Sequence, residues 1–200
     1  MVSVVTGQSP LPAVDASWTL FLDRDGVINV EKPMDYVRNW DEFQFNPGVK
    51  EALKILSGIF GKIIVVTNQR GVGKGLMTES DLKDIHENMI SEVTKKGGRI
   101  DKVYYAPDPN DDAPRRKPSP QMGLEAMQEY PGIDPQKGFM VGNTFSDMEF
   151  GRNIGVKTVF LPTTRSEPPL PHPLVDFLYP DLLTLAKAFR DAINRPSKQL

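Results

Sequence analysis

The sequence predicts an α/β protein with a doubly wound, mostly parallel sheet. Short apolar segments alternate with segments of helical periodicity along the chain, which is the pattern of successive βαβ units. Residues 62–67 (KIIVVT) contain an unbroken run of β-branched side chains, as expected for a strand that helices cover on both faces. A length of 200 residues fits a single domain.

The first half of the chain is predicted to supply three strands and two helices. Residues 18–23 (WTLFLD) form a short apolar segment and predict the first strand. Pro47 begins a helix that reaches Leu56, with its apolar side chains on one face. After the strand at 62–67, Thr78 and the acid three positions later predict the start of a helix that runs to Gly97. Residues 101–106 predict the third strand.

The second half continues this alternation. We expect a helix over 119–130, a strand over 138–142, a short helix over 146–153 and a strand over 156–161. A last strand over 175–179 and a helix over 181–194 complete the domain. Prolines cluster in the segments 107–120 and 162–180, and such clusters predict loops because proline continues neither helices nor central strands.

Several segments fall outside the alternation. Residues 24–46 mix turn and strand signals, and we expect a turn and a small hairpin there. The glycines at 71–75 miss the spacing of phosphate-binding motifs and predict a flexible turn. Residues 1–17 and 196–200 are expected to be tails outside the core, which leaves one domain over 18–195. The segments 24–66 and 107–116 are too short to hold a separate cap domain, so we expect an open site served by local loops.

Composition argues against several classes of protein. The net charge is −2 and no segment concentrates Lys or Arg, so nucleic acid is not an expected partner. The absence of cysteine excludes disulfides and thiolate zinc sites and fits a reducing compartment. The apolar runs are too short to cross a bilayer, and residues 1–17 lack the features of a signal peptide. We therefore expect a cytoplasmic protein with no membrane partner.

Polar side chains follow four of the predicted strands. Asp23 is the last residue of the first predicted strand and Asp25 follows it, and Thr67 is the last residue of the second. Ligands of open α/β sheets bind beyond the carboxyl ends of the strands, so we expect these groups to meet at one site. Two carboxylates this close repel each other unless a cation such as Mg²⁺ lies beside them. The other polar residues expected at this edge are Asn68, Gln69, Arg116, Lys117, Asn143 and Asp147.

Each of these signals also has an ordinary structural explanation. The segment 23–26 (DRDG), taken alone, is more often a solvated turn than a metal site. Asn143 and Asp147 are equally typical of an Asx turn and a helix cap. The prediction of a site therefore depends on the four strand ends together.

In this order the strand ends resemble the haloacid dehalogenase superfamily of phosphohydrolases. The segments that carry the resemblance are FLDRDGVIN at 21–29, VTNQ at 66–69 and RKP at 116–118, within a region from about Trp18 to Ile193. Within the superfamily, the chain is most similar to the family that contains D-glycero-D-manno-heptose 1,7-bisphosphate phosphatase and histidinol phosphatase.

The resemblance implies a two-step phosphoryl transfer. Asp23 would form an aspartyl-phosphate, and Asp25 would act as general acid and then as general base. Thr67 and Lys117 would stabilise the charge of the transferring group. The implied cofactor is Mg²⁺, with Asp23, Asp25, Asn143 and Asp147 as the residues of the metal site. The expected substrate contacts are Arg24, Asn68, Gln69 and Arg116.

The chain departs from the family's pattern at two places. The family usually has an acid where this chain has Asn143, so we expect weaker Mg²⁺ binding and expect Asn143→Asp to strengthen it. Family members often carry a Cys/His zinc loop. Here Ala106, Asp108 and Arg115 stand where zinc ligands would be, so no zinc is expected.

The resemblance favours hydrolysis of a small phosphorylated metabolite, most of all a sugar phosphate such as heptose 1,7-bisphosphate. Histidinol phosphate is the alternative substrate, and a phosphate-binding or regulatory domain without turnover is the alternative class. Asp35, Tyr36 and Arg38 are expected to contact the substrate beyond its reacting phosphate, although Arg38 fits a surface salt bridge equally well. We expect a monomer or a small homo-oligomer.

Overall fold

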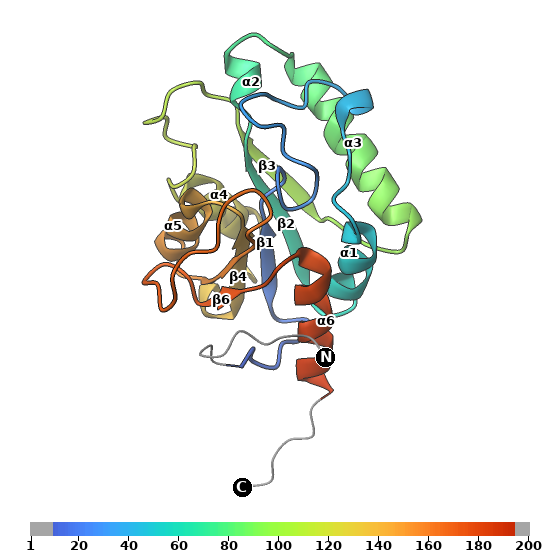
Figure 1. Ribbon diagram of the computed structural model, residues 1–200, viewed down its shortest axis with the longest axis vertical. Helices are drawn as coiled ribbons and strands as arrows, with labels where there is room; N and C mark the ends of the chain where they lie inside the picture. The colour runs from blue at the N-terminus through green and yellow to red at the C-terminus, as the bar shows by residue number, and fades with distance from the viewer. Residues whose placement is uncertain (1–9, 195–200) are drawn as a thin grey trace, which may run out of the picture.

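The computed structural model describes residues 10–194 and contains one six-stranded sheet whose neighbouring strands are all parallel (Figure 1). The strand order is β3-β2-β1-β4-β5-β6, which places β1 near the middle. The predicted α/β class and parallel sheet are confirmed, and each predicted strand is present. The strands are β1 (Thr19–Leu22), β2 (Lys62–Asn68), β3 (Lys102–Ala106), β4 (Gly138–Gly142), β5 (Lys157–Phe160) and β6 (Phe177–Leu178).

Helices cover both faces of this sheet (Figure 1). One face packs against α1 (Val49–Ser57), α3 (Glu79–Lys95) and α6 (Leu182–Ile193), and the other against α4 (Gln121–Glu129) and α5 (Phe145–Asn153). The short elements are α2 (Arg70–Gly73) and the 3₁₀ turns η1 (Trp40–Glu42) and η2 (Pro135–Lys137). Thr78 caps α3 in a reciprocal capping box with Asp81, as its sequence pattern predicts.

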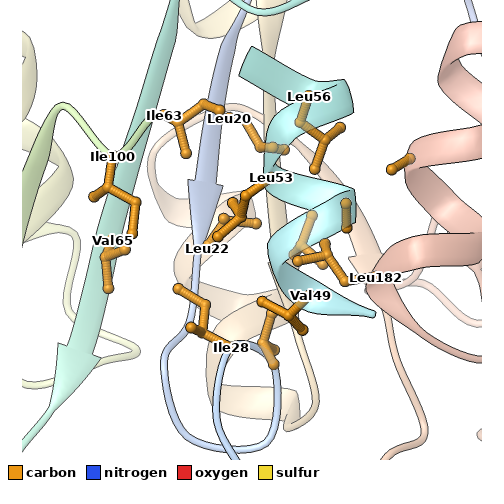
Figure 2. Packing of buried hydrophobic residues seen from close by; sticks show 14 of the residues in the cluster. Leu20, Leu22, Ile28, Val49, Leu53, Leu56, Ile63, Val65, Ile100 and Leu182 are labelled. Carbon is orange, nitrogen blue, oxygen red and sulfur yellow. The ribbon is translucent and has the colours of Figure 1, made fainter. Parts of the chain in front are cut away.

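The core is divided between the two faces because successive side chains of a strand point in opposite directions. Leu20 and Leu22 of β1 face α1 and pack with Leu53 (Figure 2). Phe21, between them, belongs to the cluster on the other face, which includes Met122 of α4. Every residue of β1 is buried, so the strand that leads into Asp23 is held from both sides.

Three sequence predictions need correction. The glycine-rich segment after β2 begins with the short helix α2 rather than with a flexible turn. The predicted hairpin in 24–46 is reduced to a single antiparallel bridge between Asn29 and Phe45, and η1 takes up part of the segment. Leu11 and Val14 are buried in the core, so the prediction of a tail over 1–17 is wrong for these two residues.

The remaining parts of the predicted tails, residues 1–9 and 195–200, lie outside the described residues. Between residues 10 and 194 no helix has the length and apolar character needed to span a membrane.

Candidate active site

The carboxyl ends of β1, β2 and β4 surround a cavity of about 210 Å³. Parallel pairing of β1 with both β2 and β4 brings the residues that follow these strands to one edge of the sheet. The cavity is lined by Asp23, Asp25, Glu31, Tyr36, Thr67, Asn68, Arg70, Arg116, Lys117, Asn143, Thr144, Ser146 and Asp147. The structure therefore brings together side chains from all four strand-end segments named from the sequence.

Lys117 connects two carboxylates at the floor of the cavity. Its Nζ lies 2.8 Å from Asp23 Oδ1 and 2.6 Å from Asp147 Oδ1, and it donates to the carbonyl oxygen of Val66 at 2.8 Å. The lysine is 3% exposed, so its charge is little screened by water. Burial alone would lower the pKa of Lys117, but Asp147 and Asp23 raise it above its ordinary value and keep the side chain cationic.

Asp23 is the carboxylate at the centre of this arrangement. Burial and the nearby Asp147 carboxylate raise its pKa to about 7, against the opposing effect of Lys117. Its Oδ1 also accepts a hydrogen bond of 2.8 Å from the backbone N–H of Arg24. A bound cation would lower this pKa by the same physics as Lys117, because an opposite charge favours the ionised form.

Asp25 is held by donors from three directions. Arg24 Nη2 donates to both of its oxygens at 3.0 Å, Asn29 Nδ2 donates at 2.9 Å and Gln69 Nε2 donates at 2.8 Å. Burial would raise the pKa of Asp25, but the Arg24 charge and these hydrogen bonds together hold it below its ordinary value. Asp25 is therefore ionised in the unliganded protein.

Arg24 and Gln69, which the sequence made expected substrate contacts, line not this cavity but an adjoining one of about 150 Å³ that shares Asp25 with it. The Arg24 side chain is fully buried, and its Nη1 lies 3.2 Å from Nε2 of His86 on α3. Gln69 donates to Thr67 Oγ1 at 2.9 Å as well as to Asp25. Both side chains thus lie behind Asp25 and fix its orientation. His86 in turn contacts Arg24 on the side away from Asp25.

Asn68 lines the cavity, but its side chain is hydrogen-bonded to the backbone of the loop that carries Lys117. Its Oδ1 accepts from the backbone N–H of Lys117 at 2.9 Å, and its Nδ2 donates to the carbonyl oxygen of the same residue at 3.3 Å. This pair of bonds joins β2 to the 107–118 loop and positions the lysine.

Asn143 and Asp147 differ in what they can offer a metal ion. Asp147 Oδ1 faces Lys117, and its Oδ2 accepts from the backbone N–H and hydroxyl of Thr144 at 3.0 and 2.7 Å, as the acid of the capping box of α5. Asn143 Oδ1, in contrast, is buried without a hydrogen-bond partner among residues 10–194. A buried carbonyl oxygen with no donor fits a ligand of a hard cation.

The donors at this edge match Mg²⁺ in kind. Asp23 and Asp25 line the cavity, the Asn143 amide oxygen is buried without a partner in the described chain, and the resemblance implies the Asp23 carboxylate, the Asp25 carbonyl and this amide oxygen as the metal's oxygen donors. No cluster of three or more His, Cys, Asp or Glu side chains suited to a metal occurs between residues 10 and 194.

The outer part of the cavity is cationic. Arg70 and Arg116 both line it, and both contact the exposed Asp111 carboxylate, at 3.1 and 3.4 Å. Arg116 Nη1 is buried without a hydrogen-bond partner in the described chain. Burial and the nearby Arg70 charge lower the pKa of Arg116, against the opposing effect of Asp111. The Asp111 carboxylate thus offsets part of this effect, and a second anion could bind the Arg116 nitrogen that lacks a partner among the described residues.

The sequence reasoning missed Arg70 and Glu31 in this cavity. Arg70 lies two residues beyond the end of β2, so the strand-end argument that selected Lys117 would have found it too. Of the loop residues expected near the substrate, Tyr36 lines the cavity, whereas Arg38 pairs with Asp35 at 2.6 Å on the surface.

Comparison with known proteins shows that the chain matches one protein family. The family profile described as "haloacid dehalogenase-like hydrolase" matches residues 13–155, well over half of the chain. The chain belongs to the haloacid dehalogenase-like hydrolases. The resemblance predicted from the strand ends is thereby confirmed.

Individual relatives of this hydrolase agree with one another. It is 41% identical over 138 residues to the D-glycero-alpha-D-manno-heptose-1,7-bisphosphate 7-phosphatase of Mycobacterium bovis, which covers 68% of the chain and 73% of the relative. It is 36% identical over 152 residues to the D-glycero-beta-D-manno-heptose-1,7-bisphosphate 7-phosphatase of Pasteurella multocida, covering 72% and 81%. Since these relatives are named phosphatases, the prediction of a phosphatase is confirmed.

A solved structure shows the same fold. The D,D-heptose 1,7-bisphosphate phosphatase from B. bronchiseptica, determined with magnesium and phosphate, superposes with a TM-score of 0.76. The match covers 87% of this chain and 98% of that one at 24% sequence identity. At this identity the likeness concerns the fold, which is the doubly wound sheet described above.

Proposed function

We propose that this hydrolase removes the 7-phosphate of D-glycero-D-manno-heptose 1,7-bisphosphate in a Mg²⁺-dependent reaction. The observation that carries the proposal is the meeting of Asp23, Lys117, Thr67 and the unpartnered Asn143 oxygen in one cavity that also holds two arginines. The heptose specificity of the relatives supports the choice of substrate.

In the first step, a carboxylate oxygen of Asp23 attacks phosphorus and the bond to the sugar oxygen breaks, which leaves an aspartyl-phosphate. Lys117, within 2.8 Å of Asp23, and the Thr67 hydroxyl stabilise the negative charge on the phosphoryl oxygens. Mg²⁺, held by Asp23, the Asp25 carbonyl and Asn143, would supply the positive charge that neutralises the phosphate and keeps Asp23 ionised.

Asp25 handles the protons of both steps. It gives a proton to the leaving sugar oxygen and later takes one from the water that hydrolyses the aspartyl-phosphate. The low pKa of Asp25 in the unliganded site suits the second role. The first role requires a proton, and the negative charge of an arriving phosphate favours its uptake, because a like charge raises the pKa of a carboxyl group.

The second phosphate of the substrate gives a reason for the cationic outer part of the cavity. Burial and the Arg70 charge lower the pKa of Arg116 in the unliganded protein, and a bidentate phosphate contact would satisfy the free Arg116 nitrogen. A monophosphate reacting at Asp23 would leave Arg116 with only the exposed Asp111 as a side-chain partner in the described chain, whereas Arg70 also donates to the carbonyl oxygen of Pro109 at 2.8 Å. This argument favours a bisphosphate over histidinol phosphate.

The test compares kcat/KM for heptose 1,7-bisphosphate in both anomeric forms, histidinol phosphate and an aryl phosphate. The bisphosphate is expected to be the best substrate, chelation of divalent metal is expected to abolish turnover, and Mg²⁺ is expected to restore it. Asp23→Asn is expected to release no phosphate from any substrate. Binding of these compounds without turnover by the wild type would instead support the non-hydrolytic alternative.

Arg116→Met separates the substrate claim from the claim of phosphatase chemistry. Charged hydrogen bonds contribute about 1.5–3 kcal/mol, so this variant is expected to lose roughly 10-fold to 100-fold in kcat/KM for the bisphosphate. Its activity on the aryl phosphate is expected to change less than about threefold, because that substrate has no second phosphate. Equal losses on both substrates would contradict the proposed role of the arginine.

A further inference from the structure

Loops from three strands meet at the Asn143 amide. Asn143 Nδ2 donates to Glu31 Oε2 at 3.0 Å and to Thr164 Oγ1 at 2.6 Å. Thr164 Oγ1 in turn donates to Glu31 Oε2 at 2.7 Å, which closes a triangle of hydrogen bonds. Glu31 follows β1, Asn143 follows β4 and Thr164 follows β5, so the triangle joins segments that are far apart in the chain.

This triangle determines which atom of the Asn143 amide, the nitrogen or the oxygen, remains free to bind a cation. A carboxylate accepts hydrogen bonds and cannot donate them, so Glu31 selects the NH₂ end of Asn143 and excludes the oxygen end. The oxygen, on the other side of the planar amide, is buried and has no hydrogen-bond partner among the described residues. Gly26 makes room for this arrangement, because a Cβ at its position, with φ of 83°, would lie 2.1 Å from Asn143 Nδ2.

Glu31 also brings charge to the site. Its carboxylate lines the same cavity as Asp23 and Asp25, and its only salt bridge in the described chain is to the exposed Arg165 at 3.2 Å. We propose that Glu31 is a positioning residue of the divalent-cation site, which with Thr164 holds the Asn143 oxygen toward the cation and supplies a carboxylate that position 143 lacks. This inference rests on the proposed Mg²⁺-dependent function.

The geometry changes one expectation drawn from the sequence. Asn143→Asp alone would replace the donor that Glu31 holds with a second carboxylate at about 3 Å, so repulsion between the two offsets the added charge. The double variant Glu31→Gln with Asn143→Asp exchanges the carboxylate and the amide. It keeps both the charge and a hydrogen bond between the two positions, because the glutamine amide can donate to the new carboxylate.

The experiment measures binding of Mn²⁺, used as a paramagnetic substitute for Mg²⁺, to the full-length protein in the absence of substrate. Glu31→Gln is expected to weaken Mn²⁺ binding about 10-fold or more, as for other changes behind a metal ligand. Thr164→Val is expected to weaken it less, and the double variant is expected to return to within about threefold of wild type. Glu167→Gln, an exposed residue of the loop that carries Thr164, is the control with the same loss of charge and is expected to bind like wild type.

The outcomes separate this inference from the proposed function. If the wild type binds no Mn²⁺, the metal site itself is wrong. If the wild type binds but Glu31→Gln binds equally well, only the role of Glu31 is wrong. If Glu31→Gln does not fold by circular dichroism, Thr164→Val decides the question, and unchanged Mn²⁺ affinity in that variant overturns the proposal.

Discussion

At the scale of single residues, the site contains buried carboxylates whose negative charges are partly compensated by buried cationic side chains. Lys117 lies between the Asp23 and Asp147 carboxylates, while Arg24 neutralises Asp25 from behind. Asp23 has the least complete compensation, since burial and Asp147 together outweigh Lys117 and its pKa rises to about 7. The proposed nucleophile is therefore the group whose ionisation is expected to respond most to the arrival of a cation.

This imbalance predicts a pH dependence of stability in the metal-free protein. Between about pH 4 and pH 7 the folded protein holds a proton on Asp23 that the unfolded chain has released, so the free energy of unfolding falls as pH rises. Asp23→Asn cannot titrate. Its stability is expected to fall less steeply over this window, by up to about 1.4 kcal/mol per pH unit. Urea unfolding of both proteins with chelator at several pH values measures the difference, and parallel curves would refute the shift.

How much of the site the sequence could predict depends on the kind of contact. Residues that follow a strand, such as Thr67 and Lys117, are placed by topology, because parallel strands bring their carboxyl ends together. Side-chain direction is not placed by topology. Arg24 stands between two aspartates in sequence yet turns inward to His86 on a helix that begins at residue 79, and no local pattern encodes that contact.

At the scale of elements, β4 and α5 are closely packed where they meet at the site. A Cβ at Gly142 would lie 2.2 Å from Asp147 Cβ, so the helix approaches the strand closely enough only because residue 142 is glycine. Asp147 then caps α5 and holds Lys117 with its other oxygen. The fold of the helix start and the position of the lysine thus depend on one close contact.

Gly142→Ala is expected to push α5 from the sheet. The expected loss in free energy of unfolding is about 1–3 kcal/mol, the usual cost of overpacking, together with a marked loss of phosphatase activity as Asp147 releases Lys117. Gly132→Ala is the matched control, since a Cβ there meets nothing within 4 Å. It is expected to stay within about 0.5 kcal/mol of wild type. Urea unfolding that ranks the two variants alike would contradict this account of the junction.

At the scale of the whole molecule, the segment before β1 is part of the structure. Leu11 and Val14 are buried in the larger core cluster, with α1, α3 and α6, although their sequence context of Pro and small polar residues resembles a tail. Local composition indicates only whether a segment forms regular structure by itself. Leu11 and Val14 are buried because they pack against residues that are distant in sequence. That is why this part of the fold could not be predicted locally.

Replacing both residues by alanine tests their contribution to the core. The double variant Leu11→Ala/Val14→Ala is expected to lose about 3 kcal/mol or more of unfolding free energy, since Leu→Ala alone costs about 2–5 kcal/mol in a core. Pro10→Ala, at an exposed neighbouring position, is expected to change stability little. Wild-type stability in the double variant would show that the segment does not contribute to the core.

The central position of β1 also governs when the protein becomes competent during its synthesis. β1 pairs on one side with β2, which follows soon after it, but on the other side with β4, which begins only at Gly138. Contacts between residues so far apart along the chain form slowly, because a long loop must close first. In a nascent chain, the strand that leads into the proposed nucleophile, Asp23, therefore has one unpaired edge until residues 138–142 emerge from the ribosome. The newly made enzyme cannot act before most of its length has been translated.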